Sequence, residues 1–512
     1  MSRRALPVAL AAGASLALAC GAGGGNGSLD ASCDPGWHAC GTGCAPDASP
    51  QSCGTLCTPC PGPGHGTATC VSGACGIACD AGYHACGASC ADDASPDSCG
   101  TSCTPCPPPA VAHARAACVA GACDHICDDG YARCAAGCCG APVAGLARLA
   151  AGEAHTCGIT AAGEVKCWGL NASGQVGDGS GVPNRLSPVP VAGSGSLTPL
   201  QVAAAFRHSC GVAQGNAYCW GDNWALQVAP ASGNHGSPVP VPGISDVRWM
   251  AGGWAHTCAL LGTGRVACWG NGEVGQIGNG SADPNAVAVP TPVSDLDGAF
   301  ALLAGYRFSC ALTDLTTMRC WGHNGSGQLG DPAAGTMATT PIPVANLGDV
   351  AAIRAVALGQ EHVCVAYDKP GASGRVRCWG RGDAGQLGNG ATPAAQKEPV
   401  EVLAGSSPLE GVSALAAGWA HTCALTEAGG VKCWGSNAQG QLGDGTGTGR
   451  STAVDVVGLA GGVAGIAAGF HHTCALAGSS PPTLACWGSN DQGQLGDGTQ
   501  ASKLSPVTIA GF

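Results

Sequence analysis

Short apolar runs alternate with glycine-rich polar turns over the last two thirds of the chain, and the alternation follows one repeated pattern. Its clearest copy occupies residues 416–425, 431–437 and 440–445, and reads A-G-x-x-H-x-C-A-L, V-x-C-W-G-x-N and G-Q-L-G-D-G. Seven Cys-Trp-Gly triplets follow one another at intervals of 49 to 58 residues, and each copy carries a further Pro-Val-like run. A unit of about 50 residues with four short strands predicts one blade of a β-propeller.

The predicted strands are too short and too glycine-rich to bury an apolar face alone. Stacking each four-stranded unit on the next covers that face, and closing the units into a ring removes the exposed ends. We therefore predict an all-β fold with a seven-bladed β-propeller at residues 141–512. Because the first copy starts with a strand at residues 146–151 and the last ends with one at 506–509, we expect the two ends to complete a shared blade.

The motifs A-G-x-x-H, C-W-G-x-N and G-Q-L-G resemble the repeats of the regulator of chromosome condensation family. The resemblance covers residues 146–512 and implies a seven-bladed β-propeller. Two copies depart from the pattern. The second reads C-W-G-D-N-W-A-L-Q at residues 219–227 and lacks the G-Q-L-G turn, and the fourth has Phe308 where the others have histidine.

The repeated histidine is a candidate metal ligand. Ring symmetry keeps the copies apart, so they cannot easily converge on one ion. We expect each to bridge backbone groups inside its own blade. The six histidines are His155, His208, His256, His362, His421 and His472.

Each copy also contains two cysteines that bracket a predicted hairpin, a departure from the cytosolic and nuclear members of the family. If Cys157 faces Cys167, then Ile159 faces Val165 and residues 161–163 form a three-residue loop with a glycine. Directly opposed strand residues lie within disulfide reach, so we predict one disulfide per blade and a chain adapted for export. The predicted pairs are Cys157 with Cys167, Cys210 with Cys219, Cys258 with Cys268, Cys310 with Cys320, Cys364 with Cys378, Cys423 with Cys433, and Cys474 with Cys486.

The N-terminus has the features of an export signal at residues 1–20. Two arginines precede an apolar stretch at residues 5–19 that is too short for an ordinary membrane span. The stretch ends in A-L-A-C, which resembles a bacterial lipoprotein box, so we expect lipidation of Cys20 and an outer-membrane or cell-surface location. Lipidation leaves an even 34 of the 35 cysteines to pair. Cleavage after Ala19 with plain secretion, or a periplasmic location, is the alternative, and residues 21–32 form a glycine-rich tether.

Residues 33–140 form a separate cysteine-rich region with its own repeat. Six cysteines between residues 33 and 60 recur 46 residues later, and a partial third copy follows. With few apolar residues, such a unit depends on cross-links, and its oxidised state fits an exported protein. We predict structural disulfides of undetermined connectivity, preceding the propeller in a loop-dominated region. The C-T-P-C sequences at residues 57–60 and 103–106 leave zinc binding or a redox dithiol as alternatives.

Charge narrows the class of ligand. The net charge is -12 and no Lys/Arg cluster occurs, which argues against a nucleic-acid partner. A Gly-Asp/Asn-Gly sequence follows the G-Q-L-G turn at Asp178, Asn279, Asp444 and Asp497. One carboxylate per loop is too few for a calcium cage, so we assign these residues to tight turns and predict no metal and no cofactor.

The residue after A-G varies between copies in a way that indicates a binding face. Five of the seven copies place an aromatic side chain there, in a chain with 4% aromatic residues. Equivalent positions of a ring lie on one face, and aromatic anchors are typical of protein-binding surfaces. Ordinary packing near the ring centre is the alternative. The candidate partner-binding residues are Phe206, Trp254, Tyr306, Trp419 and Phe470, and the other two copies have Glu153 and Gln360.

The resemblance also bears on this face. The sequence G-W-A-H-T at residues 253–257 and 418–422 is similar to a G-W-R-H-T motif in a plant light-sensing member of the family, whose tryptophans line a dimer face. Alanine replaces that arginine here at Ala255 and Ala420, which removes support for light sensing.

Three classes of function remain. The first is a non-enzymatic surface protein whose propeller binds a protein or another extracellular ligand, with membrane attachment only through the lipid. The second is guanine-nucleotide exchange, implied by the family resemblance. The third is a hydrolase or lyase, but no nucleophile elbow, helical metal pair or phosphate loop occurs.

Overall fold

The computed structural model describes residues 33–512, except 41–42, 94, 96, 109–113, 120–121, 128–130, 135–136, 141–148, 195–198 and 479–482. The described residues contain forty β-strands and no α-helix, so the all-β prediction is confirmed. No helix long and apolar enough to cross a membrane occurs among them. The predicted signal, the Cys20 lipidation site and the tether lie outside the described residues. Contacts divide the chain into two compact units, residues 1–91 and 92–512.

Disulfides organise the first unit, which consists of short hairpins. The pairs Cys33–Cys44, Cys40–Cys57, Cys53–Cys70 and Cys60–Cys75 interlace over one repeat, and Cys79–Cys90 begins the next. Each hairpin is an antiparallel pair of strands. The strands are β1 (Trp37–Cys40), β2 (Gly43–Pro46), β3 (Gly66–Val71), β4 (Ala74–Cys79), β5 (Tyr83–Cys86) and β6 (Ser89–Asp92).

The second unit begins with two more hairpins and continues into seven four-stranded antiparallel sheets, each with its strands in chain order. The hairpins are β7 (Ala114–Val119) with β8 (Ala122–Cys127), and β9 (Tyr131–Cys134) with β10 (Gly137–Gly140). The first four sheets are β11 (Leu149–Ala151), β12 (His155–Ile159), β13 (Val165–Leu170), β14 (Asn184–Pro190); β15 (Pro199–Ala204), β16 (His208–Ala213), β17 (Asn216–Gly221), β18 (His235–Pro240); β19 (Val247–Gly252), β20 (His256–Leu261), β21 (Val266–Gly270), β22 (Val287–Pro292); and β23 (Ala301–Ala304), β24 (Phe308–Leu312), β25 (Met318–His323), β26 (Met337–Pro343).

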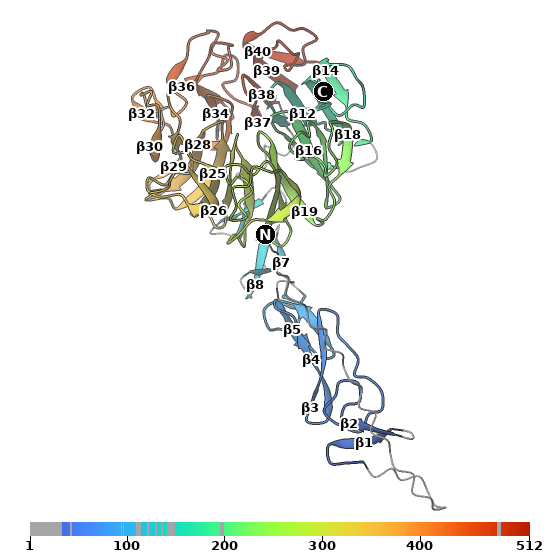
Figure 1. The fold of residues 1–512 in the computed structure, drawn as a ribbon. Coiled ribbons are helices and arrows are strands. Elements are labelled where there is room, and N and C mark those ends of the chain that lie inside the picture. The colour runs from blue at the N-terminus through green and yellow to red at the C-terminus, as the bar shows by residue number, and fades with distance from the viewer. Residues whose placement is uncertain are drawn as a thin grey trace, which may run out of the picture. The chain divides into compact units, whose positions relative to one another are not determined.

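The remaining three sheets complete the ring that Figure 1 shows. They are β27 (Ala352–Leu358), β28 (His362–Lys369), β29 (Ala372–Gly380), β30 (Gln396–Glu401); β33 (Val412–Ala417), β34 (His421–Thr426), β35 (Val431–Gly435), β36 (Arg450–Asp455); and β37 (Val463–Ala468), β38 (His472–Ala477), β39 (Thr483–Gly488), β40 (Lys503–Ile509). A small hairpin of β31 (Leu403–Ala404) and β32 (Ser407–Pro408) follows the fifth sheet. One sequence copy therefore makes one blade of a seven-bladed propeller.

The hairpin register places the two cysteines of each copy face to face. Cys157 is opposite Cys167, Ile159 is opposite Val165, and residues 161–163 form the turn, as the sequence predicts. All seven predicted pairs are disulfides, with Cα atoms 4.0–4.1 Å apart. Each bridge closes a short loop of a single hairpin, so it holds the two central strands of that blade together. In chain order, the bridges join Cys157 to Cys167, Cys210 to Cys219, Cys258 to Cys268, Cys310 to Cys320, Cys364 to Cys378, Cys423 to Cys433, and Cys474 to Cys486.

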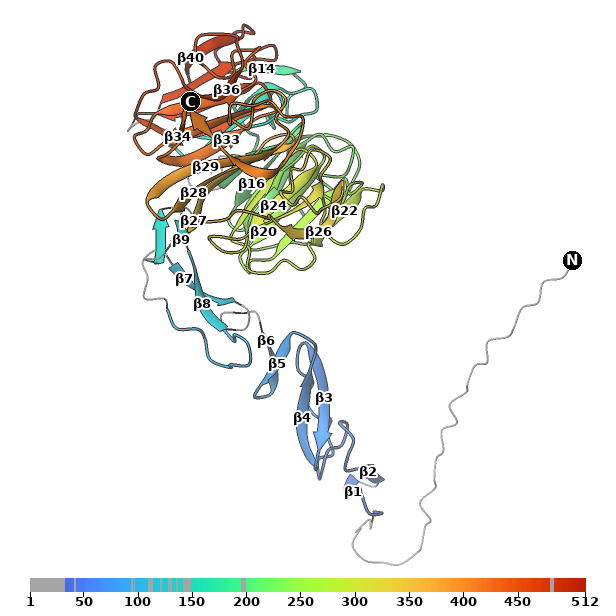
Figure 2. The same ribbon diagram turned by 90° about the vertical axis from the view of Figure 1, so that its left-hand side faces the viewer.

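The predicted shared blade is wrong. The first sheet uses only residues 149–190 and the last only residues 463–509, although β40 and β14 lie side by side (Figures 1 and 2). The ring instead closes by the same contacts that join every other pair of blades. Trp168 of the first blade donates a hydrogen bond to the Gln494 carbonyl of the last, at 3.0 Å. Because each repeat already supplies the contacts that join it to the next blade, the ring closes without a blade shared between the two ends of the chain.

The G-Q-L-G turn and the Cys-Trp-Gly tryptophan form this junction. In each blade the buried tryptophan Nε1 donates to the carbonyl oxygen of the preceding repeat's glutamine, at 2.9–3.0 Å. The second glycine of the turn lies under the same indole. A Cβ on Gly443 would come within 2.7 Å of Trp487 Nε1. Six of the seven copies have this glycine, which fits where the next blade approaches the backbone closely, and the second copy has Ala229 there without a positive φ.

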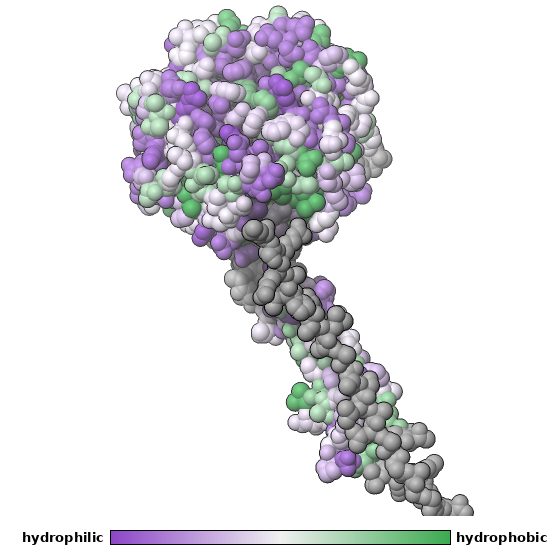
Figure 3. All heavy atoms as spheres, viewed as in Figure 1, coloured by the Kyte–Doolittle hydropathy of each residue, from purple (hydrophilic) through white to green (hydrophobic). Residues whose placement is uncertain are grey.

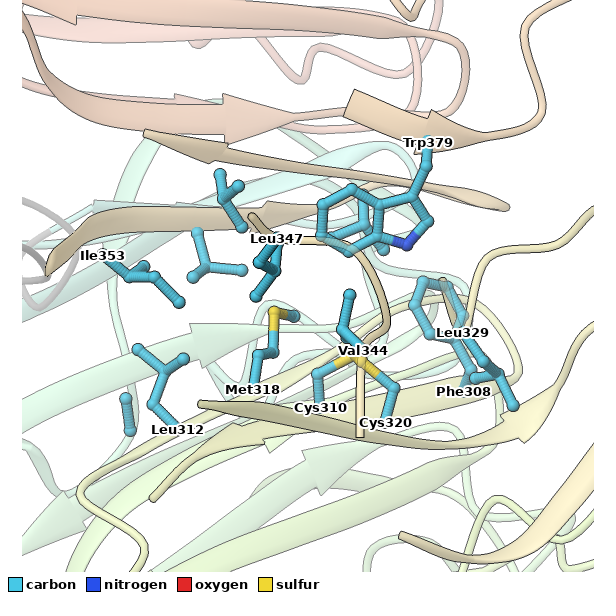
Figure 4. Close-up of a cluster of buried hydrophobic side chains, with 14 residues drawn as sticks. Phe308, Cys310, Leu312, Met318, Cys320, Leu329, Val344, Leu347, Ile353 and Trp379 are labelled. Atoms are coloured by element: carbon cyan, nitrogen blue, oxygen red, sulfur yellow. A yellow bond between two sulfur atoms is a disulfide. The ribbon is translucent and has the colours of Figure 1, made fainter. Parts of the chain in front are cut away.

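The propeller core lies between the blades and not inside them. Figure 4 shows the junction of the fourth and fifth blades, where the Cys310–Cys320 disulfide and Met318 face Trp379 across the gap. The sheets thus contribute alternate residues to two shared cores, one on each side. This arrangement fixes the turns at one end of the ring, where the candidate site lies.

Candidate functional site

The repeated histidines link neighbouring blades. Each Nε2 atom lies 2.8–3.0 Å from a Ser or Thr hydroxyl of the next blade, as in His362 with Thr422. In five of these six pairs the hydroxyl donates onward to a glutamine carbonyl, as Ser209 does to Gln175 at 2.9 Å, so the histidine nitrogen is the donor there. The expected structural role is therefore correct, but the partner is a side chain of the next blade and not a backbone group of the same blade.

Burial keeps these histidines neutral. It lowers the pKa of His155, His208, His256, His362 and His472 to about 3 and that of His421 well below its usual value. Their Nδ1 atoms have no hydrogen-bond partner among the described residues, so a second proton would be a buried charge without an acceptor. Each of these histidines is therefore a neutral structural contact between two blades, with its Nε2 atom hydrogen-bonded to one hydroxyl of the next blade.

The fourth copy confirms the pairing by changing both partners. Phe308 replaces the histidine, and Val363 stands where the next blade otherwise has Ser or Thr. Both side chains are fully buried in one apolar cluster. A hydrogen-bonded pair has been exchanged for an apolar pair, which avoids leaving one polar group unsatisfied.

The turn carboxylates also have structural partners. Asp444 Oδ1 accepts hydrogen bonds from Thr446 and Asn437, and Arg450 binds Oδ2 at 2.9 Å. Burial raises the Asp444 pKa, but these donors outweigh it and the pKa falls below its usual value. Asp178 and Asp497 likewise face Arg185 and Lys503. Where the turn has asparagine, the matching strand residue is uncharged, Val287 or Gln396.

The second copy retains a turn where the sequence indicated its loss. Leu226 takes the left-handed conformation with φ 60°, at the position of Gly174 in the first copy. The Gln227 carbonyl still accepts the Trp269 indole hydrogen at 2.9 Å. The junction therefore survives with a strained non-glycine residue, and Trp224 lies two residues before it.

The cysteines of the candidate metal or redox sites at residues 57–60 are already in disulfide bonds. The structure groups His38, Cys40 and Cys57 within metal-binding distance, and also Cys53, Cys60 and Cys75. Cys57 is bonded to Cys40, and Cys60 to Cys75, so the residues of C-T-P-C at 57–60 are not bonded to each other. In this oxidised state the sulfurs are not free thiolates, which a zinc site or a redox dithiol requires.

The five predicted aromatic residues meet at one end of the propeller axis, and we call them the aromatic patch. All five are half-buried. Ring centroids lie 4.7 Å apart for Trp419 and Phe470, 5.0 Å for Phe206 and Phe470, and 5.2 Å for Trp254 and Tyr306. The rings form one contiguous cluster, whereas the sequence led us to expect a spaced circle.

Backbone hydrogen bonds hold the loops that carry these rings. Trp254 donates to the Tyr306 carbonyl at 2.8 Å, and Phe470 donates to the Gly152 carbonyl at 3.1 Å, across the junction of last and first blades. The same loops line a hollow at the axis together with the repeated A-G glycines. Such bonds link five of the seven neighbouring pairs of loops, so the patch has a hydrogen-bonded backbone support, as a binding surface requires.

Three residues around the patch, Trp224, Arg207 and Arg307, were not predicted from the sequence. Trp224 is 56% exposed and its ring lies 5.5 Å from that of Trp254. Arg207 lies over the Phe206 ring at 5.2 Å and Arg307 over the Trp254 ring at 5.3 Å. Both arginines directly precede the histidine position in their repeats, so the residues at that position in the seven copies are a sequence signal for them. In Figure 3, which shows one face of the propeller, apolar residues are scattered in small groups among polar ones.

The fold and its junction define a ring of seven blades built from one sequence repeat. The profile of the regulator of chromosome condensation (RCC1) repeat matches residues 147–175, 250–276 and 412–441, and a second profile of this repeat matches residues 373–425 and 485–512. The chain therefore contains RCC1-type repeats within a seven-bladed β-propeller.

Named relatives share the repeats over part of their length. The ultraviolet-B receptor UVR8 of Arabidopsis thaliana is 33% identical over 263 residues, 50% of this chain and 56% of the receptor. The human probable E3 ubiquitin-protein ligase HERC6 is 30% identical over 304 residues, 57% of this chain and 27% of the ligase. The chain thus spans little more than half of one relative and about a quarter of the other.

Solved structures share the fold. Human WBSCR16 matches with a TM-score of 0.57 and 24% identity, over 65% of this chain and 87% of that chain. Prp20p of Saccharomyces cerevisiae, described with its binding properties to Gsp1p and histones, matches with a TM-score of 0.54 and 22% identity, over 63% and 80% of the two chains.

Proposed function

We propose that this chain is an exported, non-enzymatic binding protein whose aromatic patch contacts a protein partner. The observation that carries the proposal is the cluster of half-buried rings, with the exposed Trp224 beside it, at one end of the axis. Large aromatic side chains that are partly exposed and rigidly held are typical of energetic centres in protein interfaces. Prp20p supports the idea that a propeller of this kind binds proteins.

The disulfides support the exported location. Every blade and the first two cysteine-rich repeats are cross-linked, and such bonds form and persist in oxidising compartments. We infer that the N-terminal segment directs export and that Cys20 is lipidated, placing the propeller at the outer membrane or cell surface. Nucleotide exchange on a cytosolic GTPase would need the opposite location.

Site-specific photo-crosslinking tests the patch. A benzoyl-phenylalanine at position 254 of the full-length, disulfide-bonded chain, displayed on intact cells, should give a discrete crosslinked protein. The matched control is Thr263, an exposed residue of the hairpin turn at the other end of β20. Crosslinks of equal yield at both positions, or at position 263 alone, would remove the patch as the binding surface.

Cell fractionation tests the location independently. The chain should be accessible to protease on intact cells, and its mature N-terminus should be an acylated Cys20 by mass spectrometry. A soluble cytosolic protein with free thiols would contradict the proposed export.

A further inference from the structure

The charges around the aromatic patch are unbalanced. Four positions of each repeat form the patch and its rim: the two before the histidine, the one after Trp-Gly, and the residue two further along. Backbone hydrogen bonds tie these positions together in every blade, as Asp222 N with the Arg207 carbonyl at 2.9 Å. They carry six carboxylates but three guanidinium groups. The carboxylates belong to Glu153, Asp222, Glu273, Glu361, Asp383 and Asp491, and the guanidinium groups to Arg207, Arg307 and Arg381.

The three arginines are already neutralised within the chain. Arg207 donates to Glu153 at 2.6 Å and Arg307 to Glu273 at 2.6 Å. Arg381 donates to Asp383 at 2.7 Å. The positive charges of this face are therefore used in internal pairs, and the surplus is negative.

The surplus lies on three carboxylates in different blades. Asp222 and Asp491 make no ion pair within the described residues, and Glu361 reaches Arg381 and His323 only at 3.7 and 3.8 Å. Asp222 is half-buried, and its burial raises its pKa despite the nearby Arg207. It lies two residues from Trp224. A carboxylate without a close cation therefore stands beside the most exposed ring of the site.

We infer that the protein partner presents a cationic segment, with arginine or lysine side chains, to the aromatic patch and its acidic rim. This inference rests on the proposed function and specifies the chemistry of its partner. Cations pack favourably over aromatic faces, and two rings of the patch already take an arginine of the chain itself in this way. Complementary charge then raises the association rate and excludes acidic partners.

The same surplus disfavours a second copy of this chain as the occupant. Two identical faces would bring the surplus carboxylates of both copies together, while their arginines are already paired internally. Like charges brought together across an interface oppose binding. Self-association through the patch is therefore an outcome that would contradict the inference.

Peptide binding to the full-length, disulfide-bonded chain tests the chemistry. The probes are fluorescein-labelled peptides of equal length, (Gly-Arg)4, (Gly-Lys)4 and (Gly-Glu)4, measured by fluorescence anisotropy at low and moderate salt. We expect the cationic peptides to bind, the acidic peptide not to bind, and the affinity to fall with added salt. The Trp254→Ala substitution should weaken (Gly-Arg)4 binding by about fivefold, because it removes a ring from the patch.

A matched pair of variants separates specific binding from the attraction of a negatively charged chain. The site variant combines Asp222→Asn, Glu361→Gln and Asp491→Asn. The control variant combines Asp297→Asn, Glu410→Gln and Asp455→Asn, which changes the net charge equally at the other end of the strands. The site variant should lose about tenfold in affinity for (Gly-Arg)4, and the control less than twofold.

The outcomes distinguish the two proposals. Equal losses in both variants, binding of (Gly-Glu)4, or a concentration-dependent dimer that Trp254→Ala abolishes would overturn the cationic partner. A partner that crosslinks at position 254 with an affinity unchanged in the site variant would overturn it as well, while leaving the proposed function intact. Absence of crosslinks specific to position 254 would overturn the proposed function itself.

Discussion

Protonation of the junction histidines should destabilise the propeller in mild acid. Burial lowers the pKa of His362 and four of its equivalents to about 3 in the folded chain, whereas an unfolded histidine titrates near about 6.5. Because the folded pKa is the lower one, the unfolded chain binds more protons between these two values. Stability is therefore complete above the unfolded pKa and falls as the pH drops from there toward 3.

The magnitude follows from linkage. Each such histidine costs about 1.4 kcal/mol of unfolding free energy per pH unit below its unfolded pKa, or about 2 kcal/mol between pH 7.5 and 5.0. The chain itself shows how to remove one of them, because Phe308 and Val363 replace the pair at the fourth junction. The double substitution His362→Phe with Thr422→Val copies that pair at the fifth junction. It should lose about 2 kcal/mol less than the parent protein over this pH range.

Equilibrium urea unfolding with the disulfides intact, followed by tryptophan fluorescence at both pH values, measures this difference. Carboxylates are common to both proteins, so their contribution cancels. Thr422→Val alone is the control. It retains His362 and should keep the parent's pH dependence with a lower stability at every pH, because the buried histidine loses its acceptor. If the double variant and the parent lose equal free energy between pH 7.5 and 5.0, the assignment of a neutral buried His362 is refuted.

Four further substitutions test the junction and the turns by urea unfolding. Gly443→Ala should cost about 3 kcal/mol of unfolding free energy, because Gly443 has a positive φ and its Cβ would lie 2.7 Å from Trp487. The control is Gly445→Ala, which also has a positive φ but would have no atom closer than 3.7 Å to its Cβ, and it should cost about 1 kcal/mol. Similar losses in the two variants would contradict the close approach of Trp487. Gly211→Ala should change stability by less than about 0.5 kcal/mol, because the gain from removing a strand glycine is opposed by a Cβ that would lie 3.3 Å from the Gln201 carbonyl oxygen; a larger loss would show that this carbonyl cannot move away. Asp444→Asn should cost about 1 kcal/mol of unfolding free energy at pH 7. Because the pKa of Asp444 is lowered in the folded chain, the difference in stability between the variant and the parent should shrink as the pH falls below about 4. A difference that stays constant with pH would exclude the ion pair as its cause.

The fold was predictable because each repeat carries its own signals at short range. The period gave one blade per copy, and the opposed positions of Cys157 and Cys167 gave the hairpin register. Closure was not predictable from strand patterns, because it depends on the contact of Trp168 with Gln494, residues far apart in the sequence. The histidine partner was missed for the same reason, although the joint change at Phe308 and Val363 is visible in the sequence alone.

The aromatic positions were found, but their arrangement was not. Rotational symmetry predicts equivalent residues on one face and does not give the radius at which they lie. The folded structure brings the Phe206 ring, on a loop near the axis, within 5.9 Å of the Tyr306 ring, which lies two blades away. The ion pairs around them depend on side-chain reach, as with Arg307 and Glu273 from different blades, and a repeat pattern carries no such information.

Variation between the copies separates structure from function within this one chain. The junction residues are nearly uniform because each must fit the next blade, and where Phe308 replaces the histidine, Val363 replaces its partner, so both change together. The positions before the histidine and after Trp-Gly vary more widely, and they carry the patch and the surplus carboxylates. The copy that departs most from the pattern also places Leu226 at a positive φ next to Trp224, the most exposed ring. Local strain that the junction does not need, beside an exposed aromatic residue, is expected where the sequence serves binding in addition to folding.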